Sequence, residues 1–148
     1  ILPEDTAGSL FGKLSQLGAE LLLETLPLYF NGEIQPQPQD DSQATYAPML
    51  KKEDGLLDFS QPAVALERHV RAFNPWPGAY FEWNGARLKV LRARLSGEKT
   101  PGTGRRLIVA GCPAVGTGEK ILVLEEVQPA GKKSMPGKAF LAGAKDWT

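Results

Sequence analysis

The chain has 148 residues with 17 basic and 17 acidic side chains, so its formal net charge at neutral pH is zero. That length is enough for one medium domain, or for a small domain with an appendage, and for a sizeable core. The single cysteine, Cys112, excludes an internal disulfide framework and a cysteine zinc site. No apolar stretch approaches the ~20 residues of a membrane span, and no signal peptide is expected. These features predict a cytoplasmic protein in a reducing compartment, without a membrane partner.

Charge is divided unevenly along the chain. Residues 1–67 contain 11 Asp or Glu and 3 Lys or Arg, whereas residues 68–148 contain 6 Asp or Glu and 14 Lys or Arg. The two parts therefore carry net charges of −8 and +8. This asymmetry suggests a polyanionic partner for the later part alone. The alternative is a solvated surface whose sign varies by chance.

The first segment predicts a helix. Asp5 or Thr6 is suited to cap it, and the leucines that follow recur at helical spacing. We expect a kink or break at Pro27 and an end at Asn31-Gly32. The apolar stripe has no obvious partner helix elsewhere in the sequence, so this helix is expected to belong to the edge of something larger.

A linker and a second helix follow. Residues 33–46 are rich in proline and glutamine, which predicts a semi-extended linker and places the domain boundary there. In the next domain, Ser60 is suited to cap a helix over 61–73, which ends before Pro75. Glu67 and Arg71 stand four residues apart on that helix and predict an ion pair.

The remainder is typical of a small β domain. Strands are expected at 79–83, 87–95, 106–110, 113–116 and 120–127. Asn84-Gly85 predicts a two-residue hairpin turn, and "PGKAFLAG" predicts a short helix that begins at Pro136. Several short strands with Gly and Pro turns favour a mainly β fold, a small OB-like open barrel of five or six strands that carries two or three helices.

One strand carries a regular basic pattern. In "RLKVLRARL", Arg87 and Lys89 alternate with apolar residues, but the phase slips before Arg92 and Arg94. A bulge near Val90-Leu91 would return all four cations to one face. The loop cations Lys51-Lys52 and Lys132-Lys133, together with Arg105 and Arg106, strengthen a nucleic-acid interpretation. Ordinary solubilising lysines are the alternative.

Other reactive side chains lack the neighbours that chemistry needs. His69 is the only histidine, so we expect a partly exposed helical imidazole and no metal site. Cys112 has no evident base and is expected to be a packed thiol. The carboxylates Glu53, Asp54 and Asp58 are expected to be solvated or to cap turns. No active site is therefore visible in the residues themselves.

Trp76 lies between Pro75 and Pro77, which fix the backbone on both sides of the indole. Because tryptophan usually buries most of its area, we interpret it as a wedge that closes the 61–73 helix onto the barrel. A platform for a stacked base is the alternative.

Several stretches resemble the methionyl-tRNA formyltransferase family, in the family's order and spacing. They are "DTAGSLFGKLSQLGAELLLETL", "TYAPMLKKEDGLLDF", "RAFNPWPGAYFEWNGARLKV" and "QPAGKKSM". The resemblance covers essentially the whole chain but only the C-terminal half of the family's polypeptide. It implies formyl transfer from 10-formyltetrahydrofolate to the amino group of initiator methionyl-tRNA, in translation initiation. The family's catalytic motifs, such as "NxHPSLLP", are not found in this sequence.

The resemblance implies a division of the chain into three parts. Residues 1–32 correspond to the closing helix of an absent Rossmann-like catalytic domain, residues 33–46 to the linker, and residues 47–148 to a tRNA-binding barrel. The chain is then expected to bind tRNA but not to catalyse, with no catalytic residue, metal or cofactor of its own. An exposed helix at 1–32 would also allow weak self-association.

Lys52 stands where the family typically has a lysine, and Lys132 and Lys133 match its "AGKK" loop. Met49 stands where a lysine is frequent, and Leu56 and Phe59 replace a common arginine and tryptophan. The expected RNA-binding residues are Lys52, Arg71, Arg87, Lys89, Arg92, Arg94, Lys132 and Lys133.

Two other interpretations stay open. The chain also resembles the barrels of formyltetrahydrofolate dehydrogenase and sugar-amine formyltransferases, which need no polyanion-binding face. Alternatively, the barrel binds protein through an apolar patch of Trp76, Tyr80, Phe81 and Trp83.

Overall fold

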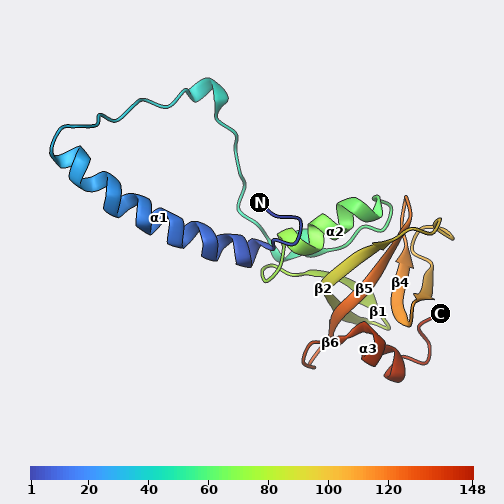
Figure 1. Ribbon diagram of the computed structural model, residues 1–148. Helices are drawn as coiled ribbons and strands as arrows, with labels where there is room; N and C mark the ends of the chain where they lie inside the picture. Colours follow the sequence, from blue (N-terminus) through green and yellow to red (C-terminus); the bar gives the residue numbers. More distant parts are fainter.

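The computed structural model describes residues 1–148 and shows a curled antiparallel sheet in the C-terminal part of the chain (Figure 1). The strands are β1 (Ala79–Trp83), β2 (Ala86–Ser96), β3 (Arg106–Val109), β4 (Cys112–Gly116), β5 (Ile121–Pro129) and β6 (Met135–Pro136). They pair in the order β1-β2-β5-β4-β3, and β6 pairs with β5. Because β1 and β3 do not pair with each other, the barrel is open between them. The predicted mainly β, open-barrel fold is confirmed; the two-residue strand β6 was not predicted.

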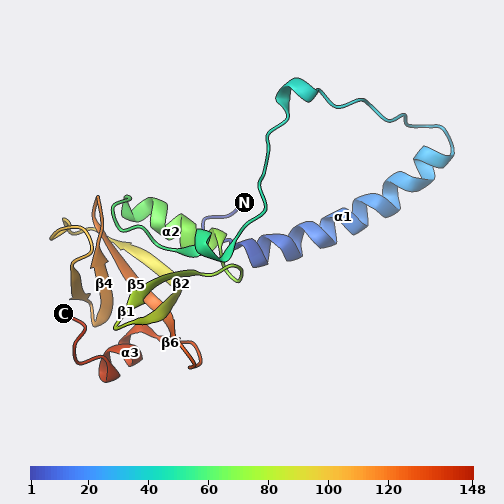
Figure 2. The same cartoon turned by 180° about the vertical axis from the view of Figure 1, so that it is seen from behind.

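Three helices accompany the sheet. They are α1 (Ala7–Phe30), α2 (Ala63–Ala72) and α3 (Gly137–Gly143), and two short 3-10 turns are η1 (Asp41–Gln43) and η2 (Lys52–Gly55). Both opposite views place α2 and α3 at opposite ends of the barrel, while α1 projects away from it (Figures 1 and 2). The chain between α1 and η2 forms a long loop that contains only η1.

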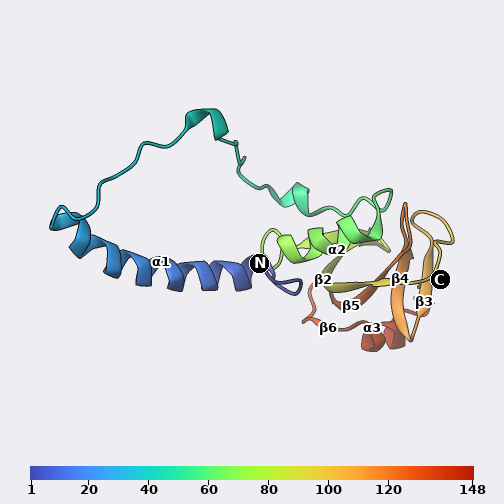
Figure 3. The ribbon, with the colours of Figure 1, turned by 45° about the horizontal axis from the view of Figure 1, so that its top comes forward.

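α1 is one continuous helix that contains Pro27, so of the expected kink or break at that residue the break is wrong (Figure 3). Thr6 caps its start by accepting a hydrogen bond from the backbone N–H of Ser9 at 3.1 Å. Pro27 lies in the last turn, where a proline removes a single backbone donor and the helix needs to continue for only three more residues. The predicted end is confirmed, because Asn31 is the C-cap and Gly32 has a φ of +74°.

The start of α1 is tied to the end of α2. The backbone N–H of Gly8 donates to the carbonyl oxygen of Asn74 at 3.0 Å. Arg71 Nη1 donates to the carbonyl oxygen of Asp5 at 3.0 Å. Elsewhere α1 has no buried residue, so its apolar side chains face solvent.

α2 begins later than the sequence predicts, because its N-cap is Pro62 and not Ser60. The backbone N–H of Ser60 instead donates to Asp58 Oδ1 at 3.0 Å, in a turn that precedes the helix. The inward face of the helix carries Leu66 and Val70, which are both buried.

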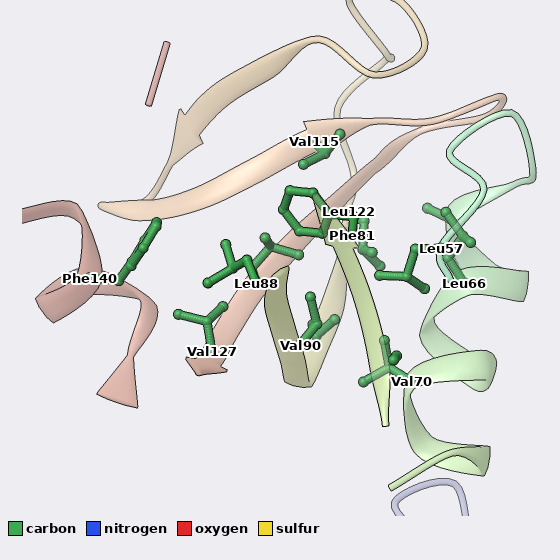
Figure 4. Close-up of a cluster of buried hydrophobic side chains, with 14 of the residues drawn as sticks. Leu57, Leu66, Val70, Phe81, Leu88, Val90, Val115, Leu122, Val127 and Phe140 are labelled. Atoms are coloured by element: carbon green, nitrogen blue, oxygen red, sulfur yellow. The ribbon is translucent and has the colours of Figure 1, made fainter. Parts of the chain in front are cut away.

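The barrel interior holds one main core of 16 buried residues, drawn from α2, α3, the barrel strands and the chain end (Figure 4). Leu88 and Val90 of β2 belong to it, and Figure 4 shows them between Phe140 of α3 on one side and Leu66 and Val70 of α2 on the other. Trp147 fills it near the C-terminus, where its Nε1 donates to the carbonyl oxygen of Leu107 at 2.8 Å. Burial of these side chains supplies the main stabilising term of the domain.

Trp76 is not part of this core. Its side chain is 53% exposed, so its interpretation as a wedge between helix and barrel is wrong. Leu66 and Val70 of α2 pack into the barrel core, and Trp76 is not among the residues of that core. The peptide bonds before Pro75 and Pro77 are both cis.

Candidate nucleic-acid interface

The β1–β2 hairpin directs two cations outward. Its turn is the predicted Asn84-Gly85 pair, whose φ angles are +51° and +72°. Along β2, Leu88 and Val90 are 1% exposed, while Arg87 before them and Lys89 between them are exposed. The alternation of a strand that covers a core therefore places both cations on the outer face of the barrel.

A bulge separates this pair from the next two cations. Val90 lies opposite Val127 and Arg92 lies opposite Glu126, which leaves Leu91 without a partner on β5. The predicted bulge is confirmed. Because of it, Ala93 returns to the core and Arg92 remains exposed.

Arg87 and Lys89 line a cleft with the β5–β6 loop. Its volume is about 280 Å³, and its other walls are Gln128, Pro129, Ala130 and Gly131. The loop is closed by hydrogen bonds from the N–H of Lys132 to the carbonyl oxygen of Pro129 at 3.0 Å and from Gln128 Nε2 to the carbonyl oxygen of Lys132 at 2.9 Å. This places Lys132 and Lys133 directly after the residues that form the cleft wall.

Close packing fixes the strand β1 that pairs with the Arg87 end of β2. The guanidinium carbon of Arg87 lies 4.5 Å from the ring centroid of Tyr80, a cation–π contact that holds its direction. The Leu57 N–H donates to the carbonyl oxygen of Tyr80 at 2.8 Å. Gly55 packs so tightly on Gly78 that any side chain there would collide with the Gly78 carbonyl oxygen. The turn η2 is therefore fixed against the start of β1.

We define the basic face as those exposed cations of β2, the β5–β6 loop and η2 that form no ion pair within the chain. Its members are Lys52, Arg87, Lys89, Lys132 and Lys133. None of them takes part in any of the ion pairs of the molecule. No carboxylate oxygen therefore lies within ion-pair distance of these five groups.

The other predicted RNA-binding residues have partners inside the protein. Arg92 Nε and Arg94 Nε each lie 3.1 Å from a carboxylate oxygen of Glu125. Arg71 Nε lies 2.6 Å from Glu67 Oε1, which confirms the predicted helical pair, and this hydrogen bond raises the pKa of Arg71. With its further bond to Asp5, Arg71 joins α1 to α2.

Not every cation of the basic half lies near the basic face. The guanidinium carbon of Arg106 lies 5.8 Å from the ring centroid of Trp147, and the residue lines a larger cavity of about 610 Å³ between β1 and β3. Lys138 lies against Gly111 in the turn after β3. The basic face therefore includes only some of the cations of residues 68–148.

Reactive groups are isolated from one another. The His69 ring packs edge-on against Phe73 at 4.3 Å between centroids, and burial lowers its pKa. Asp54 and Asp58 each accept a backbone N–H of their own loop, as expected of turn-capping carboxylates. No group of three or more His, Cys, Asp or Glu side chains is placed to hold a metal ion. None of the helices combines the length and the apolar character needed to cross a membrane.

Comparison with known families adds a decisive match. Residues 49–145 match the family described as "Formyl transferase, C-terminal domain". The chain belongs to this family. Membership of the formyl transferase C-terminal domain family accounts for the whole barrel, from η2 to the end of α3.

Curated relatives of this formyl transferase domain are named methionyl-tRNA formyltransferase. The protein of Chloroflexus aurantiacus is 48% identical over 144 residues, which cover 95% of this chain and 46% of the relative. That of Myxococcus xanthus is 46% identical over 149 residues, which cover 98% of this chain and 46% of the relative. The resemblance inferred from the motifs is confirmed, and the chain spans about half the length of these relatives.

Solved structures share the fold at low sequence identity. A variant of HypX from Aquifex aeolicus matches with a TM-score of 0.72 and 19% identity, covering 98% of this chain and 27% of HypX. HypX in complex with tetrahydrofolic acid matches with a TM-score of 0.65 and 21% identity, covering 86% of this chain and 23% of HypX. These likenesses support the arrangement of the elements only.

Proposed function

We propose that this formyl transferase domain is the tRNA-binding part of a methionyl-tRNA formyltransferase, and that its basic face binds the sugar-phosphate backbone of initiator methionyl-tRNA. The observation that carries the proposal is the basic face itself, whose five cations make no ion pair within the chain. Free ammonium and guanidinium groups displace counterions condensed on a nucleic acid, which supplies affinity without sequence preference. The names of the relatives give the class of polyanion.

The chemical step belongs to the part of such an enzyme that lies outside this chain. A formyl group from 10-formyltetrahydrofolate would reach the methionyl amino group there, while this domain holds the tRNA in the cytoplasm. The residues present do not fit a folate site, because a pterin needs several buried donors and acceptors in one cavity. The two buried side-chain polar atoms that lack a partner, His69 Nε2 and Trp83 Nε1, lie on different elements. The chain alone is therefore proposed to bind and not to catalyse.

The cations predicted to bind RNA differ in how free they are to contact phosphate. Arg87 and Lys89 line one cleft and Lys132 and Lys133 directly follow its wall, while Lys52 lies on the turn that packs against Gly78, before β1. Arg92 and Arg94 flank this group, but they share the charge of Glu125. The guanidinium of Arg71 is engaged by Glu67 and by Asp5, so we assign it to the join between α1 and α2.

α1 offers a second, separate surface. We propose that the rest of a full-length enzyme covers its apolar side chains, which are exposed from Phe11 to Phe30. In this chain, where that cover is lacking, the same side chains support weak self-association. Residues 1–32, 33–46 and 47–148 are accordingly proposed as helix, linker and tRNA-binding domain.

Titration with initiator tRNA at several salt concentrations tests the proposed function. The affinity should fall with salt by a log–log slope of about −0.7 to −0.9 per neutralised phosphate. A Lys132→Ala, Lys133→Ala double variant should weaken binding and make the slope shallower by about two phosphates' worth. The Lys99→Ala, Lys145→Ala double variant, which removes two exposed cations outside the basic face, is the matched control and should have little effect. A salt-independent affinity, or equal losses in both variants, would contradict the proposal.

A further inference from the structure

Trp76 is an exposed aromatic side chain on a rigid loop. Its side chain is 53% exposed, whereas Trp147 is 1% exposed and Trp83 is half-buried. The loop is fixed at both ends, because Asn74 Nδ2 donates to the carbonyl oxygen of Leu91 at 3.0 Å and the N–H of Gly78 donates to that of Phe73 at 2.9 Å. The indole is thus held in one region of space without contributing to the core.

The loop that carries Trp76 lies beside the basic face. A side chain at Gly78 would lie 3.9 Å from the Cδ and Cε atoms of Lys89, so the Lys89 stem runs past the end of the loop. Trp76 is two residues from Gly78, and two residues span at most about 7 Å of chain. Lys89 in turn shares its cleft with Arg87. An aromatic face, an ammonium and a guanidinium therefore follow one another across the surface.

We propose that Trp76 is a stacking platform for one unpaired base of the bound tRNA, whose neighbouring phosphates lie on Lys89 and Arg87. The proposal rests on the proposed function and adds a base contact to its phosphate contacts. Aromatic side chains beside a cationic groove are the usual means by which proteins bind single-stranded nucleic acid. The base must be unpaired, because within a helix its faces are covered by its neighbours.

The test compares two RNA ligands and three variants. The ligands are initiator tRNA and a fully base-paired RNA duplex with blunt ends, and the variants are Trp76→Leu, Trp76→Phe and, as control, Tyr46→Leu. Tyr46 is 91% exposed and lies in the linker, so its replacement removes an exposed aromatic ring that is not on the Trp76 loop. Thermal unfolding of each variant checks that the fold is kept, which is expected because Trp76 has no core contact.

Trp76→Leu should weaken tRNA binding about tenfold without changing the salt slope, because it removes stacking and no charge. Trp76→Phe should restore most of the affinity, and Tyr46→Leu should leave it unchanged. Binding of the paired duplex should be the same for all of these proteins. Tryptophan fluorescence of the wild type should be quenched by tRNA, and Trp76→Leu should lose that quenching.

The outcomes separate the two proposals. If tRNA binds with the expected salt slope but Trp76→Leu binds as tightly as the wild type, the platform is overturned and the proposed function stands. If Trp76→Leu instead abolishes self-association in sedimentation experiments and leaves tRNA affinity intact, Trp76 belongs to a protein contact, which also overturns the platform. If the wild type shows no salt-sensitive tRNA binding, both proposals fail.

Discussion

Among single residues, His69 shows how burial sets the charge of a side chain on α2. Burial lowers its pKa below the usual 6.5, and the backbone and charge of Asp54 oppose that shift only in part. The unfolded chain therefore binds this proton more tightly than the folded chain does. The contribution of neutral His69 to stability is fully present above the pKa of the unfolded state. It is lost as the pH falls from that value towards the lower pKa of the folded state.

We therefore expect the free energy of unfolding to decrease between pH 7 and pH 5. Urea titrations at several pH values measure this slope, and His69→Gln, which cannot titrate, should flatten it. Because His69 is the only histidine, no other imidazole contributes in this window. Asp5 has its pKa lowered by Lys13, by the N–H of Leu2 and by Ser9, and its effect belongs to more acidic solutions. An unchanged slope in the variant would show that His69 is not the group responsible.

At the scale of elements, the pairing of β2 with β5 determines which arginines of β2 form an ion pair within the chain. Glu125 on β5 lies 3.1 Å from both Arg92 and Arg94, so one carboxylate restrains two guanidinium groups. Both arginines are partly exposed, and such a pair contributes little to stability.

Glu125→Gln should therefore raise tRNA affinity a few-fold at low salt and steepen the salt slope, with little change in the melting temperature. Filter binding or fluorescence anisotropy at two salt concentrations measures both effects. Glu119→Gln removes the same charge from the exposed β4–β5 turn and is the matched control. Equal gains in the two variants would mean that overall charge, and not release of the arginines, sets the affinity.

The elements that were predicted correctly are those whose structure depends on residues close together in the sequence. β1 was predicted from 79 to 83 as observed, and the Asn84-Gly85 turn and the bulge at Leu91 follow from φ preferences and from the need to bury one face. The break at Pro27 was wrong, because a single lost donor near a helix end does not outweigh the remaining hydrogen bonds.

Contacts between residues that are distant in the sequence could not be predicted from local patterns. The role of Arg71 depends on Asp5, 66 residues earlier, and the burial of Trp147 depends on Leu107. Trp76 was misplaced because a residue's average burial was applied to a site where α2 and the barrel already meet closely. The cations of β2 could be predicted, but which of them are neutralised depends on Glu125 across the sheet.

At the scale of the whole molecule, stability is concentrated in the barrel. All 16 residues of the main core lie between Leu57 and Trp147. The segment 1–46 adds no buried apolar side chain, and its ties to α2 are made by Gly8 and Asp5. The residues 47–148 should therefore fold alone, with a loss of about 1–2 kcal/mol from the missing hydrogen bonds. Urea unfolding followed by tryptophan fluorescence measures this, and a non-cooperative transition would contradict it.

The same division predicts where self-association arises. α1 has 24 residues, so it is about 36 Å long, and leucines such as Leu17 and Leu21 are roughly half exposed along it. An apolar surface of that extent lowers its free energy by pairing with a second copy. Sedimentation velocity should show weak, concentration-dependent association of the full chain. Leu17→Gln with Leu21→Gln should abolish it while leaving the salt-dependent tRNA affinity intact.

Val64→Gln, at an exposed apolar position of α2, is the control for that experiment. It should associate like the wild type, because its side chain lies on the barrel and not on α1. If association persists in the α1 variant and is lost in Val64→Gln, the barrel itself is the contact surface. That outcome would support the interpretation in which the barrel binds protein. It would also mean that α1 does not mediate self-association.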